Sequence, residues 1–426
     1  MRNCKSFMLT VFLMLCSVTF TCCAEELSGD PSGNGNGNPN GNNDTDKDTT
    51  NYNLVDFPKG YSPIEIGQKL TNRFITVDYS TKRTNKVNYS FWGNIYSTNT
   101  PDHVTYPDVC AWLGALWFAD AAKNDNLYNG VVKKFDPLFT TDIKFQPSLR
   151  PSASNIVDYY VFGAVPLQIY QRKQESKYYD LGMKYADGQW TLPSNATQTQ
   201  KDWYDKGYSW QTRLWIDDMF MITALQAQAY HATGDEKYRE RTIDEMVLYL
   251  DEIQRDNGLF YHAPNAPFYW ARGNGWMAAG MVEVLKLLPA DHKHKQKIMN
   301  AYIKMMKELA KYQRPDGMWS QLIDHPNTAD MWAESSGSAM FTYAMISGVK
   351  NGWLEEEKYG TVARKGWLAL VSFLDRNFDI TEVCEGTGVG YSYEYYRDRR
   401  RWIGDTHGLA AMLWSAYALI LQTETD

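Results

Sequence analysis

The stretch MFMITALQAQAYHATG, residues 219–234, has apolar side chains at three- and four-residue spacing and ends in a glycine. This period predicts a helix, because it places the apolar residues on the faces that a packed helix buries. Residues 111–123 (AWLGALWFADAAK) and 277–289 (MAAGMVEVLKLLP) have the same pattern. Alternation of β-branched residues is scarce, so from about Leu54 onward we predict a helical chain without βαβ units.

The predicted helices repeat along the chain. A hydrophilic link followed by a Leu-Tyr or Lys-Tyr pair begins a helix at four places, and a fifth member falls near residue 298; the tyrosines are Tyr128, Tyr178, Tyr238 and Tyr359. A Gly-x-aromatic marker follows at Gly188, Gly258 and Gly317, where we expect a left-handed turn and a buried aromatic ring. Each period therefore predicts a helix, a short link, a second helix and a long loop.

About six such helix pairs fill the chain after its N-terminal region. Six pairs are able to stack as an open solenoid or to close into a ring. The long loops are rich in Trp, Gly and Asp. This favours a closed barrel whose mouth, the end that carries these loops, is lined by them, over an open solenoid that only binds a partner. The predicted fold class is therefore all-α, an (α/α)6 barrel of about six helix hairpins.

The composition excludes several classes of protein. With 44% hydrophobic and 22% charged residues, the chain is globular rather than disordered. Its net charge of -7 argues against a dominant basic surface, so we expect no nucleic-acid partner. Its 15 Trp and 29 Tyr residues suit a cleft that stacks on sugar rings.

The N-terminal region has the pattern of an export signal. Arg2 and Lys5 precede an apolar run over residues 7–20, which is too short for a transmembrane helix. The Cys-Cys-Ala sequence behind it resembles a bacterial lipoprotein signal with Cys22 or Cys23 as the lipidated residue. Simple cleavage after the alanine is the alternative.

A Gly- and Asn-rich stretch follows the signal and predicts a disordered tether. We therefore expect a signal peptide over residues 1–24, a tether over 25–53 and a catalytic domain over 54–426. The expected location is the outer membrane, through a lipid anchor, or the periplasm of a bacterium. The cysteines left in the domain, Cys110 and Cys384, predict neither a disulfide scaffold nor a zinc site.

Two adjacent carboxylates precede the helix of residues 219–234. Acidic residues in a first turn commonly cap a helix, and this structural role fits Asp218. Asp217 fits it less well, because it lies between Trp215 and Met221 at helical spacing. An aromatic wall desolvates a carboxyl group and raises its pKa, which is how a general acid is made.

A second cluster is WARGNGW, residues 270–276. Two glycines flank an asparagine in front of a predicted helix, where exposed amides and the Arg272 guanidinium would hold a carboxylate. The structural alternative is a helix-entry turn with an arginine that packs through its stem. The flanking Trp270 and Trp276 make that alternative the less favoured one.

Three single residues have roles that the sequence pattern leaves open. His262, eight residues before Trp270, is explained equally well by core packing and by function. Asp158 is one acid in an apolar aromatic run, so it either caps its helix or faces the cleft. His407 precedes the last predicted helix, and a place at the mouth is its less favoured assignment.

Five motifs, taken in order, resemble glycoside hydrolase family 105, which is close to family 88 and contains unsaturated rhamnogalacturonyl and glucuronyl hydrolases. They are WIDDMFM (215–221), WARGNGW (270–276), DGMWSQLID (316–324), AESSGSAMFTYA (333–344) and VCEGTGVG (383–390). The resemblance implies an (α/α)6 barrel. It also implies removal of a 4,5-unsaturated uronic acid from the non-reducing end of lyase-generated oligosaccharides, such as those of pectin rhamnogalacturonan.

In the family chemistry an Asp protonates C4 of the double bond, water adds at C5, and the hemiketal opens and expels the aglycone. The resemblance places the acid/base of this reaction on Asp217 rather than on Asp218, and it implies no metal and no cofactor. Some members have a further site histidine shortly before the acid, but residues 204–213 (YDKGYSWQTR) contain none. Tyr208 and Gln211 are candidates to replace it, and neither is favoured. The implied substrate-binding residues are Asp158, His262, Trp270, Arg272 and Trp276.

Three alternatives remain open at this level. An inverting glycosidase on the same barrel would use Asp217 and Asp158 as its pair of carboxyl groups. A sugar epimerase would need two site histidines, of which only His262 is well placed. A non-catalytic surface glycan-binding lipoprotein would need the aromatic residues but no desolvated Asp217.

Overall fold

The computed structural model describes residues 51–76, 95–96, 104–139 and 156–422. These residues belong to the compact unit Lys47–Asp426. The predicted signal peptide and all but the last residues of the predicted tether lie outside the described residues. Within the part that is described, no helix is both long enough and apolar enough to cross a membrane.

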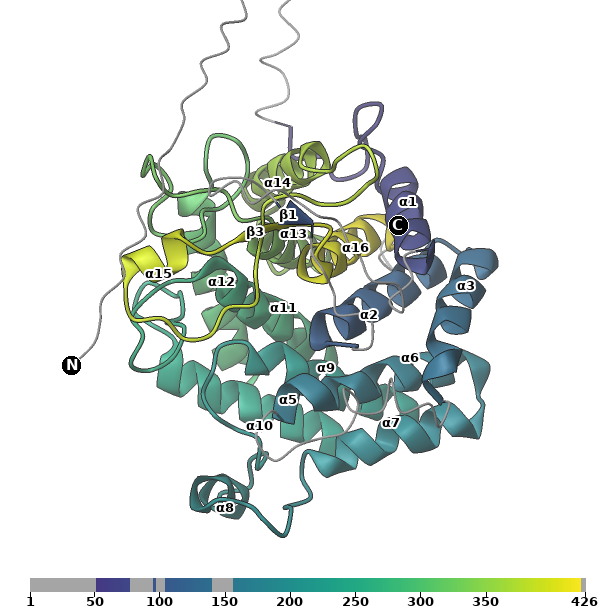
Figure 1. The fold of residues 1–426 in the computed structure, drawn as a ribbon. Helices are drawn as coiled ribbons and strands as arrows, with labels where there is room; N and C mark the ends of the chain where they lie inside the picture. The colour runs from purple at the N-terminus through teal and green to yellow at the C-terminus, as the bar shows by residue number, and fades with distance from the viewer. Residues whose placement is uncertain (1–50, 77–94, 97–103, 140–155, 423–426) are drawn as a thin grey trace, which may run out of the picture. The chain divides into compact units, whose positions relative to one another are not determined.

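In the described part of the chain, six helices form an inner ring in which each contacts the next and the last contacts the first (Figure 1). Apart from the C-terminal half of α6, their residues are buried on almost every side, which is why their sequences are largely apolar all round. The six are α2 (Tyr106–Ala121), α6 (Ala164–Lys173), α9 (Asp218–Thr233), α11 (Ala271–Leu287), α13 (Ser335–Lys350) and α16 (Thr406–Ile420).

Each inner helix packs mainly against one outer helix. That outer helix follows it in the chain, except for α1, which pairs with α16 and closes the ring. The outer helices are amphipathic: α12, for example, buries residues at three- and four-residue spacing. The outer helices are α1 (Pro63–Thr76), α3 (Asp125–Phe135), α7 (Ser176–Gly188), α10 (Glu236–Ile253), α12 (Lys295–Tyr312) and α14 (Thr361–Ser372). The described chain therefore has the predicted (α/α)6 barrel.

The sequence markers fall at equivalent places in this barrel. The recurrent tyrosines lie near the starts of α3, α7 and α10 and just before α14, and Ile298 occupies the same place in α12. Gly258 and Gly317 have φ of +94° and +88°, as predicted for left-handed turns. The prediction was wrong for Gly188, because α7 continues through this residue in ordinary helical geometry.

Short elements decorate the barrel. A three-stranded sheet in the order β1-β3-β2 was not predicted; Trp402 of β3 pairs with Ile95 in parallel and with Val383 in antiparallel register. The short elements are β1 (Ile95–Tyr96), β2 (Val383–Cys384), β3 (Arg401–Ile403), α5 (Ile156–Tyr160), α8 (Gln198–Asp205), α15 (Tyr393–Arg397), η1 (Asp136–Phe139), η2 (Val161–Gly163) and η3 (Glu356–Gly360).

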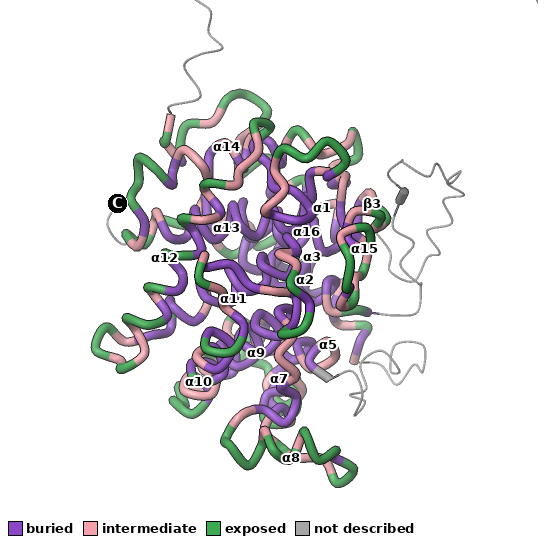
Figure 2. The backbone as a smooth tube through the Cα atoms, turned by 90° about the vertical axis from the view of Figure 1, so that its left-hand side faces the viewer, coloured by how far each residue is buried: buried purple, intermediate pink, exposed green. Residues whose placement is uncertain are grey.

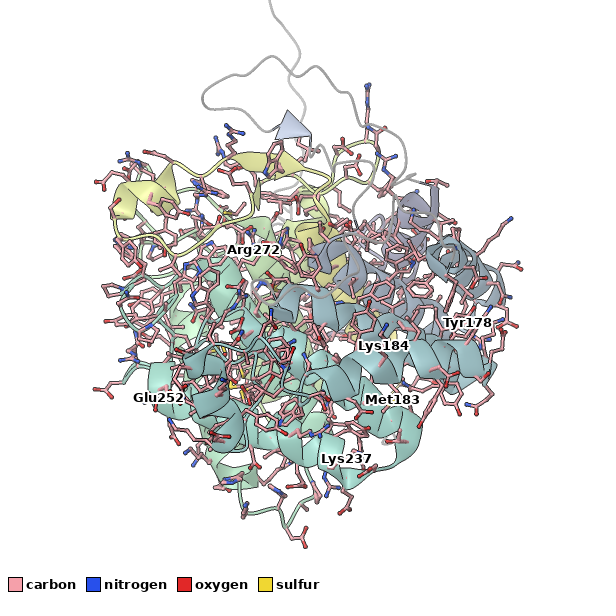
Figure 3. The ribbon with its side chains drawn as sticks, turned by 60° about the horizontal axis from the view of Figure 1, so that its bottom comes forward. Tyr178, Met183, Lys184, Lys237, Glu252 and Arg272 are labelled. Carbon is pink, nitrogen blue, oxygen red and sulfur yellow. The ribbon has the colours of Figure 1, made fainter. Side chains whose placement is uncertain are left out.

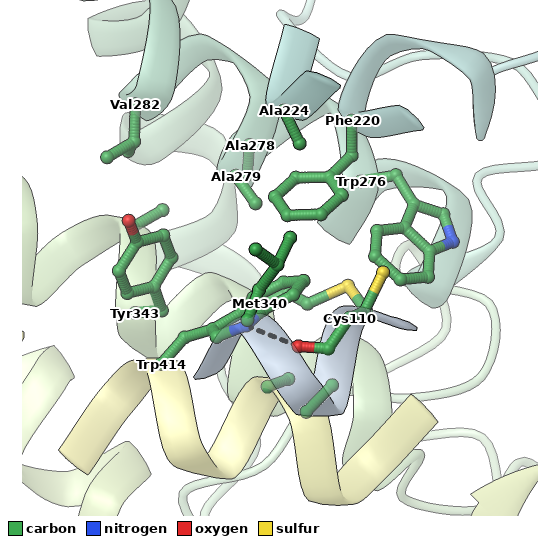
Figure 4. Close-up of a cluster of buried hydrophobic side chains, with 14 of the residues drawn as sticks. Cys110, Phe220, Ala224, Trp276, Ala278, Ala279, Val282, Met340, Tyr343 and Trp414 are labelled. Atoms are coloured by element: carbon green, nitrogen blue, oxygen red, sulfur yellow. Dashed lines mark hydrogen bonds between the residues drawn. The ribbon is translucent and has the colours of Figure 1, made fainter. Parts of the chain in front are cut away.

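The centre of the ring is filled with side chains. The backbone of α9, α11 and α13 is buried over most of its length, whereas exposed backbone gathers at α8 and in the loops (Figure 2). Phe220 stacks on Trp414 with ring centroids 4.5 Å apart, and the Trp414 indole donates to the Cys110 carbonyl oxygen at 3.2 Å (Figure 4). This core supports the helix ends on which the candidate site is built.

Candidate active site

The N-terminal ends of the inner helices meet at one end of the barrel, because each inner helix returns through an outer helix and all six therefore run in the same direction. The positive ends of their dipoles favour a bound anion there. Asp158 lies in α5, just ahead of α6. The residues that cap the other five inner helices are Thr105, Asp217, Trp270, Glu334 and Asp405.

Asp217 is the N-cap residue of α9, but its side chain makes no capping hydrogen bond, and the residue is only 8% exposed. Burial raises the pKa of Asp217 to about 7. Arg272 and Arg213 oppose this shift, and the neighbouring carboxylates Asp218 and Asp158 add to it. Asp217 is therefore protonated at mildly acidic pH, which is the state that a general acid needs.

Asp218 does not cap α9, which corrects the sequence prediction. Its carboxylate is fully buried and accepts hydrogen bonds from Arg213 Nε at 2.8 Å and from the Tyr249 hydroxyl at 2.7 Å. The cap position belongs to Asp217, so Asp218 is already helical and its side chain turns inward. Burial raises the pKa of Asp218, while Arg213 and Tyr249 oppose that shift.

Arg213 connects the two acids that surround Asp217. Besides its contact with Asp218, its Nη2 lies 3.4 Å from Oδ1 of Asp158. The next residue, Leu214, has φ of +55°, a left-handed conformation that is unusual for a branched side chain. The segment that leads into Asp217 is therefore held by an ion-pair network, and Asp158 faces this network rather than solvent alone.

His262 lies beside Asp217 and is fully buried. Its Nδ1 is 2.7 Å from the Tyr396 hydroxyl, and its Nε2 is 3.7 Å from Oδ2 of Asp217 with no hydrogen-bond partner among the described residues. Burial and the charge of Arg272 lower the pKa of His262 to about 3. The imidazole is thus neutral, and one of its nitrogens is directed toward the candidate acid.

Arg272 is completely buried near the N-terminus of α11, far from outer-layer residues such as Tyr178 and Lys237 (Figure 3). Its Nη1 and Nη2 donate to the carbonyl oxygens of Cys384 and Glu385 at 2.5 and 2.6 Å. The guanidinium also lies 4.7 Å from the Trp270 ring centroid. It supplies a fixed positive charge below the candidate site.

The predicted turn in front of this helix is instead the first turn of α11 itself, so its amides do not form a separate loop. Asn274 uses its side chain to bind the backbone of Phe260, donating to the carbonyl oxygen and accepting from the amide. The flanking glycines allow close packing, since a Cβ at Gly273 would lie 2.5 Å from Ile216 Cγ2. Packing, rather than anion binding by the turn, explains these glycines.

The two predicted tryptophans differ in their surroundings. Trp270 packs against His262, with ring centroids 4.5 Å apart, and so forms part of the wall near Asp217. Trp276 is fully buried in the core against Phe220 at 5.3 Å. Its contact with the site is indirect, through Tyr106 at 6.1 Å.

The sequence analysis missed Tyr106, Tyr396 and Asp405 and named His407 only as a less favoured candidate. Asp405 Oδ1 lies 2.6 Å from His407 Nδ1, and His407 Nε2 lies 2.7 Å from the Tyr106 hydroxyl. The close spacing of Asp405 and His407 ahead of a helix was a usable signal. Tyr106 and Tyr396 gave no signal, because their partners are 301 and 134 residues away in the chain.

Of the two candidate replacements for the missing histidine, Gln211 is the more notable. It is fully buried, and neither atom of its side-chain amide has a hydrogen-bond partner among the described residues. Tyr208 packs edge-on against Trp203 instead. In the same described portion, no three His, Cys, Asp or Glu side chains are grouped as metal ligands would be.

Comparison with curated proteins finds relatives that are named unsaturated 3S-rhamnoglycuronyl hydrolases. The unsaturated 3S-rhamnoglycuronyl hydrolase of Formosa agariphila is 33% identical over 189 residues, which are 39% of this chain and 48% of that protein. The protein of the same name from an Alteromonas species is 31% identical over 166 residues, 37% of this chain and 40% of that protein. The alignments therefore span about half the length of these relatives or less.

Solved structures share the fold. A possible member of glycoside hydrolase family 105 from Salmonella enterica superposes with a TM-score of 0.70 at 18% identity, covering 85% of this chain and 95% of that chain. A family 88 glycosyl hydrolase from Bacteroides vulgatus gives a TM-score of 0.64 at 16% identity, covering 84% and 98%. The profile of Glycosyl Hydrolase Family 88 matches residues 76–421. Because this match covers most of the chain, the protein belongs to Glycosyl Hydrolase Family 88, to which the family 105 predicted from its motifs is closely related.

Proposed function

We propose that the protein is a glycoside hydrolase that removes a 4,5-unsaturated uronic acid from the non-reducing end of lyase-generated oligosaccharides. The observation that carries the proposal is Asp217, a buried acid with a pKa of about 7 beside the neutral imidazole of His262. Hydration of a C4–C5 double bond needs a proton donor from the protein, and its nucleophile is water rather than a side chain. Family membership and the names of the two relatives support this substrate class.

The reaction begins when the Asp217 carboxyl group gives its proton to C4 of the unsaturated ring. The positive charge that develops at C5 is shared with the ring oxygen, and water adds there. The C5 hemiketal then opens, and the hemiacetal left at C1 expels the aglycone. Because C1 is not attacked, the separation of carboxyl groups that distinguishes inverting from retaining glycosidases does not apply.

The uronate carboxylate binds where positive charge is already concentrated. Arg272 provides a buried guanidinium, and the N-terminal ends of the inner helices add their dipoles. The Arg272 donors Nη1 and Nη2 are occupied by carbonyl oxygens, whereas its buried Nε has no hydrogen-bond partner among the described residues. Trp270 and His262 form an adjacent aromatic surface on which the ring rests.

A panel of saturated and lyase-generated unsaturated oligosaccharides tests this proposal. Pectin, arabinogalactan, ulvan and glycosaminoglycan fragments would also identify the aglycone. In ¹⁸O-labelled water the label should enter C5 of the opened uronate. Label at C1, or activity on saturated substrates, would favour an inverting glycosidase with Asp217 and Asp158 as its pair.

The Asp217→Asn variant separates an enzyme from a glycan-binding protein. The amide keeps size and polarity but cannot donate the proton, so the variant should bind the unsaturated sugar and lose activity by about 100-fold or more. Unchanged turnover would exclude Asp217 as the acid.

The proposed location is outside the cytoplasm, with a lipid anchor at Cys22 or Cys23. This rests on the charged and apolar pattern of the first 20 residues and on the adjacent cysteines. Metabolic labelling with a radioactive fatty acid checks the anchor. Label that persists when both cysteines are replaced by alanine would contradict it.

A further inference from the structure

We infer that Glu245 of the outer helix α10, in its protonated form, is a positioning residue that fixes the chain segment leading into Asp217. The inference rests on the proposed function, in which Asp217 is the proton donor. Glu245 acts through residues 209–213, which end in Arg213 and lead toward this acid. An acid in the outer layer of the barrel therefore decides where the proton donor lies.

The position of Asp217 depends on the backbone that precedes it. Its side chain makes no capping hydrogen bond, so it has no such contact to fix it at the end of α9. The backbone of residues 209–217 is irregular, yet most of these residues are buried. A buried irregular segment needs partners for its amide and carbonyl groups, because no regular ladder of hydrogen bonds satisfies them.

Helix α10 supplies such partners at two points of the segment. The Ser209 amide donates to Oε2 of Glu245 at 3.2 Å. The Leu214 amide donates to the Tyr249 hydroxyl at 3.1 Å, and that hydroxyl donates in turn to Asp218. Glu245 and Tyr249 are four residues apart, so they lie on one face of the helix. This face holds the segment both at its start and just ahead of the acid.

The hydrogen bonds around Thr212 assign a proton to Glu245. The Thr212 hydroxyl oxygen lies 2.8 Å from the Ser209 carbonyl oxygen and also contacts Oε1 of Glu245 at hydrogen-bond distance. A hydroxyl group has one hydrogen to donate, and a carbonyl oxygen only accepts. Both contacts are hydrogen bonds when Glu245 donates to Thr212 and Thr212 donates to Ser209. The Ser209 amide donates back to Glu245, which closes a ring.

The surroundings of Glu245 favour this protonated form. The residue is fully buried, and its two hydrogen-bond partners, the Ser209 amide and the Thr212 hydroxyl, are neutral. An ionised carboxylate would be a buried charge with only neutral partners, which is unfavourable. It would also take the Thr212 hydrogen away from the Ser209 carbonyl oxygen. Ionisation therefore opens the ring and releases the segment ahead of Asp217.

Groups from both neighbouring elements act on Glu245. Burial raises the pKa of Glu245 to about 8, against the opposing effect of its two hydrogen bonds. Two carboxylates add to the rise, and two tyrosines nearby have raised pKa values of their own and stay neutral at pH 8. These groups are Asp218 of α9, Asp244 and Tyr249 of α10, and Tyr208 ahead of the segment.

Infrared difference spectroscopy of the wild type and Glu245→Gln detects the proton without any substrate. The introduced amide reproduces the protonated acid, since its oxygen accepts from Ser209 and its nitrogen donates to Thr212. At about pH 6 the variant should lose the carbonyl band of a protonated carboxyl group. Loss of a carboxylate band instead would overturn the inference. Glu252→Gln, an exposed position of α10 (Figure 3), is the control and should lose a carboxylate band.

The pH profile of kcat/KM tests whether this proton matters for catalysis. The wild type loses the Asp217 proton near pH 7 and the Glu245 proton near pH 8. Its logarithmic profile should therefore steepen from a slope of about -1 to about -2 above both pKa values. Glu245→Gln cannot ionise and should keep a slope of about -1, whereas Glu252→Gln should steepen like the wild type. A slope of about -2 in Glu245→Gln would overturn the inference.

Glu245→Met keeps the length of the side chain but removes both hydrogen bonds. The variant should lower kcat by about 100-fold, because a small displacement of a catalytic group has an effect of this size. KM should change little, since Trp270 and Arg272 are placed by the start of α11. Unchanged kcat, or a loss confined to KM, would overturn the positioning role.

Glu245→Gln also decides the matter if Glu245→Met fails to fold. With its ring of hydrogen bonds retained, Glu245→Gln should keep kcat close to the wild-type value below pH 7. A kcat as low as that expected for Glu245→Met would overturn the inference. A wild type inactive on every unsaturated substrate would instead overturn the proposed function, and the infrared spectrum would still decide whether Glu245 is protonated.

Discussion

Asp217 should make the folded protein less stable as the pH rises, and Asp217→Asn should remove this dependence. The pKa of this acid is raised from 3.8 to about 7 by burial in a residue that is only 8% exposed. The folded protein therefore holds the proton more tightly than the unfolded chain does. The contribution of Asp217 to stability therefore falls as the pH rises from 3.8 to 7 and is constant above that range.

The size of the effect follows from the width of this range. One pKa unit corresponds to about 1.4 kcal/mol, and pH 5 to pH 8 includes two units below the folded pKa, so the loss is about 2–3 kcal/mol. Urea unfolding of the wild type and of Asp217→Asn at both pH values measures it. The free energy of unfolding of the variant, relative to that of the wild type, should be higher at pH 8 than at pH 5 by that amount.

An exposed acid provides the control. Asp180 lies on the surface of α7, and Asp180→Asn should follow the pH dependence of the wild type. If Asp217→Asn also runs parallel to the wild type between pH 5 and 8, Asp217 does not carry a raised pKa. In that case its assignment as the general acid loses its physical basis, whatever the activity of the variant.

The other substitutions address recognition, tuning and packing. Arg272→Ala should weaken transition-state binding of a uronate substrate by about 2–4 kcal/mol, measured as kcat/KM; unchanged kinetics would exclude its role. Asp218→Asn should retain far more activity than Asp217→Asn and move the alkaline limb to lower pH, because a negative neighbour is lost; a limb that moves to higher pH would contradict this. Gly337→Ala should destabilise the fold by about 1–3 kcal/mol in thermal unfolding, because the added Cβ would lie 2.6 Å from the backbone of Ala271; unchanged stability would show that the backbone gives way.

The fold could be predicted from sequence because its information is local and repeated. The apolar faces of helices such as residues 219–234 and the glycine turns at Gly258 and Gly317 depend on neighbours within a few residues. The expected turn at WARGNGW was wrong for the complementary reason. Its glycines are required by packing against Ile216 and Met340, contacts that only the closed ring creates.

The candidate site was predictable only in part, and the division has the same cause. Asp217 could be identified from the sequence because an acid among apolar residues is unusual, and those residues are its neighbours in the chain. Asp218 was misassigned as a cap because its partner Tyr249 lies 31 residues away on the next helix. The contact between Tyr106 and His407 exists only because α2 and α16 become neighbours when the ring closes.

The charges at the helix ends link substrate binding to the protonation state of Asp217. A helix N-terminus and Arg272 both favour an ionised Asp217, yet burial outweighs them in the free protein. A uronate carboxylate bound there would offset Arg272 and add a negative charge near Asp217, so the pKa of the acid should rise further. The alkaline limb of kcat, which reports the bound enzyme, should then lie at higher pH than the limb of kcat/KM, near pH 7. Coincident limbs would mean that the carboxylate binds too far from Asp217 to act on it. Separated limbs would show that the bound substrate itself keeps Asp217 protonated.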